Sequence, residues 1–107
     1  GFLMNCGELL TARRLGIHLV ILVLCDRNLS LIEIKQNWKQ VPQYGTQLYE
    51  GDYFAADKFL GVPVLTVHEE GEMKAALQKA FSASGPVIVE AFVDGSVYNK
   101  LVTRSYK

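Results

Sequence analysis

The apolar positions in the first part of the chain change their spacing at Gly16. Before it, apolar residues recur at helical intervals, and Asn5 with Glu8 has the spacing of a capping box at a helix start. Gly16 itself suits the left-handed conformation that often ends a helix. The next stretch, 18–25, is apolar without alternation, which is typical of a strand covered on both faces in a parallel sheet. We therefore predict a helix followed by a buried strand.

The rest of the chain continues this alternation. Helical spacing predicts a helix over 30–39, whereas 41–51 has no clean period and is interpreted as an ordered loop. Asp52 is a favourable N-cap, so a helix is expected from there to a stop at Gly61, with Phe54, Ala55, Phe59 and Leu60 on it. A strand, an amphipathic helix and a strand are predicted at 62–68, 69–81 and 86–93. This order indicates an α/β fold, an open three-layer parallel sheet with helices on both faces.

Length and composition limit the possible architectures and partners. A chain of 107 residues suffices for one core, and we expect a partial domain over 1–95 and a C-terminal tail over 96–107. Its 11 basic and 11 acidic residues balance, which favours neither nucleic acid nor an anionic membrane as partner. The longest apolar run is far shorter than the roughly 20 residues of a membrane span. Cys6 and Cys25 lack zinc-site spacing and fit free thiols in the cytoplasm.

Polar residues stand where the predicted strands end. Asp26, Arg27 and Asn28 follow the first strand directly, His68 ends the second, and Asp94 follows the third. Ligands of open α/β sheets bind at such carboxyl ends. Asp26 has two interpretations: a carboxylate that caps the following helix, or an oxygen ligand of Mg²⁺ beside helix N–H groups that bind a phosphate. The residues alone leave both open.

Four stretches, GFLMN, ELLTA, LVLCD and LSLIEIKQ, follow one another in the order of a known motif. They resemble the diphosphate-binding domain of thiamine-diphosphate enzymes, in particular the acetolactate synthase and pyruvate oxidase group. The family motif begins Gly-Asp-Gly and closes with Asn-Asn. Here no Gly-Asp-Gly precedes Gly1, and Cys25-Asp26 replaces Asn-Asn. A fainter likeness continues over 52–94, and the resemblance implies a thiamine-diphosphate-binding fold that is incomplete on its N-terminal side, as in a fragment of a longer protein.

The resemblance also implies which residues hold the cofactor. Asp26 falls on the metal-liganding position of the second asparagine, and the backbone carbonyl of Asn28 would be a further ligand of Mg²⁺. The residues expected against the diphosphate are Gly1, Phe2, Leu29 and Leu31. Ile32 would face the reacting end of the cofactor. No catalytic residue is expected in this chain, because the family's activating glutamate lies in another domain, usually on a neighbouring subunit.

By the same resemblance, the chain would be the C-terminal cofactor-binding part of a thiamine-diphosphate- and Mg²⁺-dependent transferase or lyase acting on 2-oxo acids, with acetolactate synthase-like decarboxylation and carboligation. Expected partners are the 2-oxo acid, other domains of the enzyme and neighbouring subunits in a homo-oligomer. The isolated chain should be inactive, and it should self-associate, either by pairing of an unpaired sheet edge or through the tail from Ser96. The competing class is a non-catalytic flavodoxin-like or receiver-like module, which binding of FMN or phosphorylation would distinguish.

Overall fold

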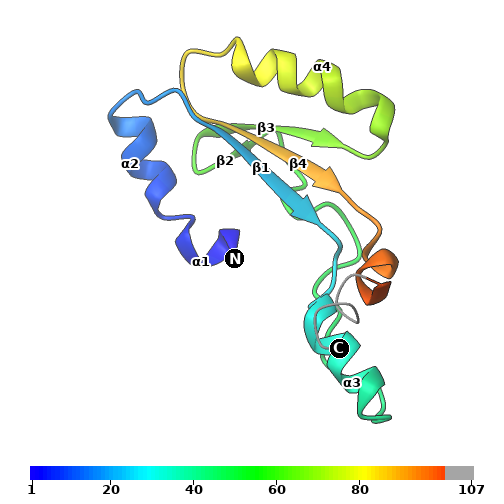
Figure 1. Ribbon diagram of the computed structural model, residues 1–107. Helices are drawn as coiled ribbons and strands as arrows, with labels where there is room; N and C mark the ends of the chain where they lie inside the picture. The colour runs from blue at the N-terminus through cyan, green and yellow to red at the C-terminus, as the bar shows by residue number, and fades with distance from the viewer. Residues whose placement is uncertain (101–107) are drawn as a thin grey trace. The chain divides into compact units, whose positions relative to one another are not determined.

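The computed structural model describes residues 1–100 of the chain. Its elements are, in order, α1 (Phe2–Asn5), α2 (Glu8–Arg14), β1 (Val20–Cys25), α3 (Ser30–Trp38), β2 (Lys58–Phe59), β3 (Val62–Val67), α4 (Glu70–Phe81), β4 (Val87–Phe92) and the 3-10 helix η1 (Gly95–Val97) (Figure 1). No helix of the described residues is long and apolar enough to cross a bilayer.

The chain forms two compact units. Unit 1 contains Gly1–Leu24 and Phe54–Phe92, and unit 2 contains Cys25–Tyr53 and the segment from Val93 onward. The expected boundary between a domain over 1–95 and a tail over 96–107 stays a prediction. Residues 101–107 of that tail lie outside the described residues.

The strands form one four-stranded sheet in the order β1-β4-β3-β2. β3 and β4 are parallel, with Val64 opposite Ile88, and the arrow of β1 runs in the same direction as that of β4 (Figure 1). β2 adds a short strand antiparallel to β3, so the sheet is mixed. The predicted α/β class is confirmed, and the strands expected near 18–25, 62–68 and 86–93 are all present.

Helices cover the sheet of unit 1 on both faces. Ala80 of α4 lies in a buried cluster with Val89 of β4. Leu9 of α2 lies in a second buried cluster with Ile88, the neighbouring residue of the same strand. Because successive side chains of a strand point to opposite faces, these two clusters are the two sides of one sheet. Full burial of a side chain such as Ile88 contributes about 1.5–3 kcal/mol, so both faces stabilise the unit.

The predicted capping box at the first helix is wrong. Asn5 is the last residue of α1, and Gly7, with helical backbone angles, precedes α2 without a side-chain cap. Asn5 therefore lacks the extended conformation from which an N-cap side chain bonds the first turn. The predicted end is confirmed: Gly16 has φ +64, and the Ile17 N–H donates to the Ala12 carbonyl at 3.0 Å, as in a Schellman motif.

The helix predicted after Asp52 is also wrong. β2 and β3 instead form a hairpin in which Phe59 pairs with Val62. The two residues between them, Leu60 and Gly61, have φ of +50 and +75, the left-handed values of a type I′ turn. Pairing with β3 thus prevails over the helix propensity of the segment.

An aromatic cluster in unit 1 anchors this hairpin. The rings of Phe54 and Phe59 lie 5.0 Å apart at an angle of 63°, and Phe2 of α1 lies 5.8 Å from Phe54. Edge-to-face pairs of this kind add about 0.5–1.5 kcal/mol each beyond the area they bury. The residues expected on a helix thus serve to join the hairpin to α1.

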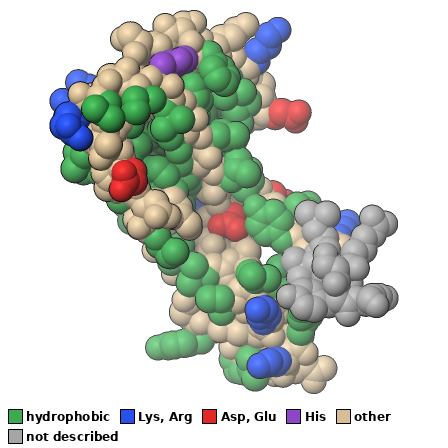
Figure 2. Space-filling view, turned by 60° about the vertical axis from the view of Figure 1, so that its left-hand side comes forward, with side chains coloured by type: hydrophobic (Ala, Val, Ile, Leu, Met, Phe, Trp, Pro, Cys, Tyr) green, Lys and Arg blue, Asp and Glu red, His purple; other side chains and the backbone are tan. Residues whose placement is uncertain are grey.

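β1 lies at the edge of the sheet. The prediction that helices cover this strand on both faces is wrong. Val20 packs beside the cluster below α4. Leu22 and Leu24, further along the same face, are 47% and 60% exposed because none of the described helices packs over them. They belong to the many apolar side chains at the surface, of which Figure 2 shows one side.

Gly61→Ala should lower the free energy of unfolding by about 1–2 kcal/mol, since φ of +75 is left-handed. A Cβ there would also overlap the guanidinium of Arg13. The control Gly71→Ala, in the first turn of α4 with open space around it, should be neutral or stabilising. Urea unfolding followed by circular dichroism compares the two. Equal midpoints would contradict the prediction, and adding Arg13→Ala separates overlap from backbone strain.

Candidate functional site

The turn after β1 is held by the side chain of Asp26, in unit 2. Oδ1 of Asp26 accepts the backbone N–H of Asn28 at 3.2 Å, and Oδ2 accepts the Ser30 hydroxyl at 2.5 Å. The first bond makes an Asx turn. Leu29, not Asp26, is the N-cap of α3, so Asp26 stabilises the turn without capping the helix itself. A carboxylate offers about four acceptor positions, which leaves two for a ligand.

Backbone groups beside Asp26 are available for a ligand as well. The Leu29 carbonyl accepts the N–H groups of Ile32 and Glu33 at 2.9 and 3.1 Å. Ser30 and Leu31 are the first two residues of α3, so their N–H groups have no partner within the helix. The turn therefore combines a carboxylate with the N-terminal donors of a nine-residue helix, an arrangement that suits an anion and its counter-cation.

A bridge joins this turn to the loop over 41–51. Asn28 pairs with Gln47, while the bonds of the bridge run from the Leu29 N–H to the Thr46 carbonyl (2.7 Å) and from the Leu48 N–H to the Arg27 carbonyl (2.9 Å). The carbonyl of Asn28 takes no part in these bonds. The predicted ordered loop is confirmed, and the bridge does not engage the carbonyl that the resemblance assigned to a metal.

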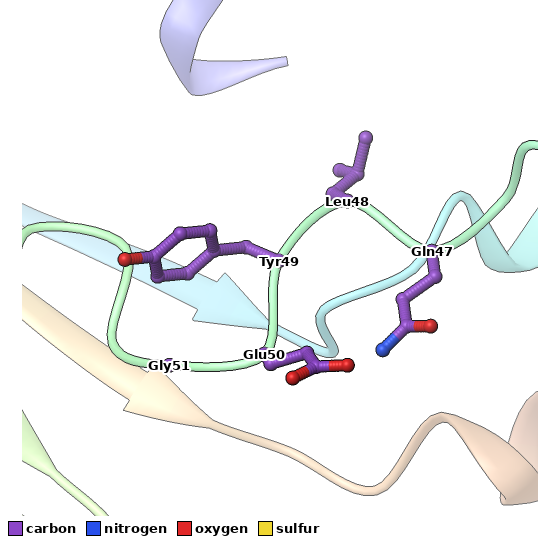
Figure 3. A pocket seen from close by; sticks show the side chains of 5 residues that line it. All are labelled: Gln47, Leu48, Tyr49, Glu50 and Gly51. Carbon is purple, nitrogen blue, oxygen red and sulfur yellow. The ribbon is translucent and has the colours of Figure 1, made fainter.

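The loop encloses an open hollow of about 470 Å³. The side chains of Gln47 and Glu50 point to the same side of the loop, whereas Leu48 points away from them (Figure 3). The Tyr49 ring lies across the bend, where any Cβ at Gly51 would be 3.1 Å from it. Leu48 thus lies on the opposite side of this loop from Gln47 and Glu50 (Figure 3).

Arg27 joins the turn to the end of this loop. Its Nε donates to the Gly51 carbonyl at 3.3 Å, and its Nη2 lies 3.9 Å from the Asp52 carboxylate. Arg27 has φ +63, a conformation that costs a non-glycine residue about 1 kcal/mol. Burial raises the pKa of the nearby Tyr53 above 10.0, with Cys25 and Asp26 acting in the same direction and Arg27 opposing them.

A polar cavity of about 300 Å³ lies between this turn and η1 within unit 2. Asp26 and Ser30 line it together with Asp94 and Ser96. Asp94 accepts the backbone N–H of Ser96 at 2.9 Å, and this bond, aided by the Ser96 hydroxyl, lowers the pKa of the Asp94 carboxyl. Among residues 1–100, no group of three or more His, Cys, Asp or Glu could hold a metal, so a cation here would need ligands from a bound anion.

The structure brings most of the predicted site residues into one turn. Asp26, Asn28, Leu29, Leu31 and Ile32 lie there, with the side chains of Leu31 and Ile32 52% and 48% exposed. The other two, Gly1 and Phe2, belong to unit 1, where the Phe2 ring packs in the aromatic cluster. The roles of all seven stay predictions.

Sequence reasoning missed Ser30 and Gly95, and it placed Arg27 at the strand end without the contacts that Arg27 makes. The contacts of Arg27 with Gly51 and Asp52 depend on a left-handed backbone that a residue with a side chain does not favour. No sequence signal therefore identified these contacts. Ser30 had a signal, because a serine four residues after an aspartate at a strand end can bond it across the turn. Gly95 is recognised only through its contacts, described below.

Comparisons with known proteins agree with the motif in the first part of the chain. The family model of the thiamine pyrophosphate enzymes' C-terminal TPP binding domain matches residues 1–91. YdaP of Bacillus subtilis (strain 168), named as a thiamine pyrophosphate-containing protein, is 29% identical over 93 residues, 87% of this chain and 16% of YdaP. IlvB2 of Mycobacterium tuberculosis (strain ATCC 25618 / H37Rv), named as an acetolactate synthase large subunit, is 28% identical over 96 residues, which cover 90% of this chain and 17% of IlvB2. The chain spans about one sixth of the length of these relatives.

Replacing Arg27 should free the loop from the turn. Arg27→Ala loses the side-chain contacts and keeps the strained backbone, whereas Arg27→Gly loses the contacts and relieves the strain. The alanine variant should therefore be less stable than the glycine variant by about 1 kcal/mol. Both should be cut faster by chymotrypsin at Tyr49 and Tyr53. Cleavage at the rate of the unmodified protein would show that Arg27 does not hold the loop.

Proposed function

This chain belongs to the thiamine pyrophosphate enzymes, as their C-terminal TPP-binding domain, and on that premise we propose that its turn at 26–32 holds thiamine diphosphate through Mg²⁺. The observation that carries the proposal is the donor set of this turn. The Asp26 carboxylate, the Asn28 carbonyl and the N–H groups of Ser30 and Leu31 occur together within unit 2.

These donors suit the magnesium salt of a diphosphate. Mg²⁺ prefers oxygen ligands and is commonly held by one or two carboxylates together with phosphate oxygens and water. Asp26 and Asn28 would supply the protein ligands. The amides at the start of α3 would bind the anion, which the helix dipole also favours. Few protein ligands are therefore expected, because the diphosphate oxygens would fill the other ligand positions of the Mg²⁺ ion.

A carboxylate at position 26 also suits its own surroundings. Each of its oxygens accepts one hydrogen bond, from Asn28 and from Ser30, and keeps a further acceptor position. A carboxamide has a single oxygen with two acceptor positions, so it could accept one of these two hydrogen bonds and still offer a position to a cation, whereas the carboxylate accepts both.

The reaction we propose is acetolactate synthase-like and acts on a 2-oxo acid, by decarboxylation and carboligation, in a transferase or lyase. Thiamine diphosphate held by these residues would supply a nucleophilic carbon for chemistry at the substrate carbonyl. The residues of this chain bind and orient the diphosphate end. The name of the M. tuberculosis relative supports this class. Family membership argues against the flavodoxin-like and receiver-like alternatives.

The remaining parts of the proposal concern partners and location. Other domains of the same enzyme and neighbouring subunits of a homo-oligomer would complete the active site, so the 107-residue chain by itself should be inactive. The free thiols of Cys6 and Cys25 support a cytoplasmic location.

Asp26→Ala in the complete polypeptide should weaken Mg²⁺-dependent binding of thiamine diphosphate by about 100-fold or more, because a ligand oxygen is lost. Asp26→Asn keeps one oxygen and should lose about 10-fold at most. Titration calorimetry with and without Mg²⁺ measures both. Asp57→Ala, which removes an exposed carboxylate of unit 1, controls for net charge. An alanine variant with unchanged affinity would refute the metal role of Asp26.

The isolated 107-residue chain should self-associate through β1. This edge strand contains no charged residue or proline, and Leu22 and Leu24 are exposed on it. Light scattering at tens of micromolar should report dimers or larger species. The double variant Leu22→Lys/Leu24→Lys should shift the dimers and larger species toward monomer. The control Leu10→Lys on α2 should leave the distribution unchanged. A monomeric unmodified chain would contradict this prediction.

A further inference from the structure

We propose that Ser30 is a positioning residue that holds the Asp26 carboxylate in the orientation needed for the cation, and that the absence of a side chain at Gly95 leaves the Ser30 hydroxyl the room to do so. The inference rests on the proposed function, since it takes Asp26 as a ligand of Mg²⁺. It adds two residues to that site which the motif does not assign.

The first observation is the bond between the two side chains. The Ser30 hydroxyl donates to Oδ2 of Asp26 at 2.5 Å, within the short range of hydrogen bonds to ionised acceptors. Asn28 binds the other oxygen through its N–H. With a donor on each oxygen, rotation of the carboxylate would break at least one bond. Its two unused acceptor positions are therefore held in a defined direction.

The second observation is that the hydroxyl comes from a rigid element. Ser30 is the first residue of α3, and the N–H groups of Ile32 and Glu33 close the helix start on the Leu29 carbonyl. Its backbone is therefore fixed relative to the turn that carries Asp26. Groups that orient metal ligands act best from such elements, and their removal typically weakens metal binding 10- to 100-fold.

The third observation is independent and comes from the segment after β4. The Val93 N–H donates to the Cys25 carbonyl at 2.9 Å, which places this segment beside the Asp26 turn within unit 2. A Cβ at Gly95 would lie 3.1 Å from the Ser30 hydroxyl oxygen and 3.4 Å from the Asp26 Cβ. Gly95 is not left-handed, so what a side chain would meet here is crowding: the Ser30 hydroxyl would have to shift by a few tenths of an ångström. The missing side chain at position 95 therefore leaves room for the Ser30–Asp26 pair.

Metal affinity separates this role from a merely structural one. In the complete polypeptide at saturating thiamine diphosphate, Ser30→Ala should weaken Mg²⁺ binding about 10-fold and leave the thermal unfolding midpoint without Mg²⁺ nearly unchanged. Ser30→Thr, which keeps the hydroxyl, should restore most of the affinity. Gly95→Ala should weaken Mg²⁺ binding in the same direction, because it displaces the Ser30 hydroxyl. Ser84→Ala, at an exposed serine of unit 1, is the matched control.

Mn²⁺ provides a second readout that does not depend on activity. Its electron paramagnetic resonance spectrum in the complex with thiamine diphosphate should change in Ser30→Ala and Gly95→Ala and match the unmodified protein in Ser30→Thr. Unchanged affinity and spectrum in Ser30→Ala, when Asp26→Ala has lost Mg²⁺ binding, would overturn the positioning role and leave the proposed function standing. Unchanged Mg²⁺ binding in Asp26→Ala would overturn both.

Discussion

The alternation of side chains along β4 is the constraint on which unit 1 depends. β4 has a neighbouring strand on each side, and its residues from Val87 to Ala91 are buried. Val89 contributes to the cluster below α4, and Ile88 contributes to the cluster below α2. Because one strand supplies both clusters, a shift of its register by one residue would exchange the two faces and disrupt both.

Unit 2 depends on polar contacts within a short stretch of backbone. The Asp26 carboxylate, the Arg27 carbonyl and guanidinium, and the Asn28 N–H each make a specific hydrogen bond. Together these bonds hold the turn, the start of α3 and the loop over 41–51 in one arrangement. The same bonds leave the Asn28 carbonyl and two amides of α3 available, so the geometry that stabilises the turn also provides the donors for a diphosphate and its cation.

Gly61 and Gly95 favour glycine for different physical reasons. Gly61 has a left-handed backbone in the turn of a hairpin, so any side chain there is strained. Gly95 has no such backbone constraint, and a side chain there would instead crowd the Ser30–Asp26 pair. The first requirement belongs to the fold of unit 1, and the second belongs to the candidate site of unit 2.

Sequence patterns determined the α/β class, the three longer strands, α3, α4 and the position of Asp26 at a strand end. These features follow from local periodicity and from a motif read along the chain. Tertiary structure decided the hairpin after Asp52, where pairing with β3 and contact with Phe2 outweigh local helix propensity. It also decided the contacts of Arg27, Ser30 and Gly95. The Arg27 and Gly95 contacts join segments more than 20 residues apart in sequence, which no local pattern records, whereas the Ser30–Asp26 bond spans four residues and depends on the backbone conformation of the turn.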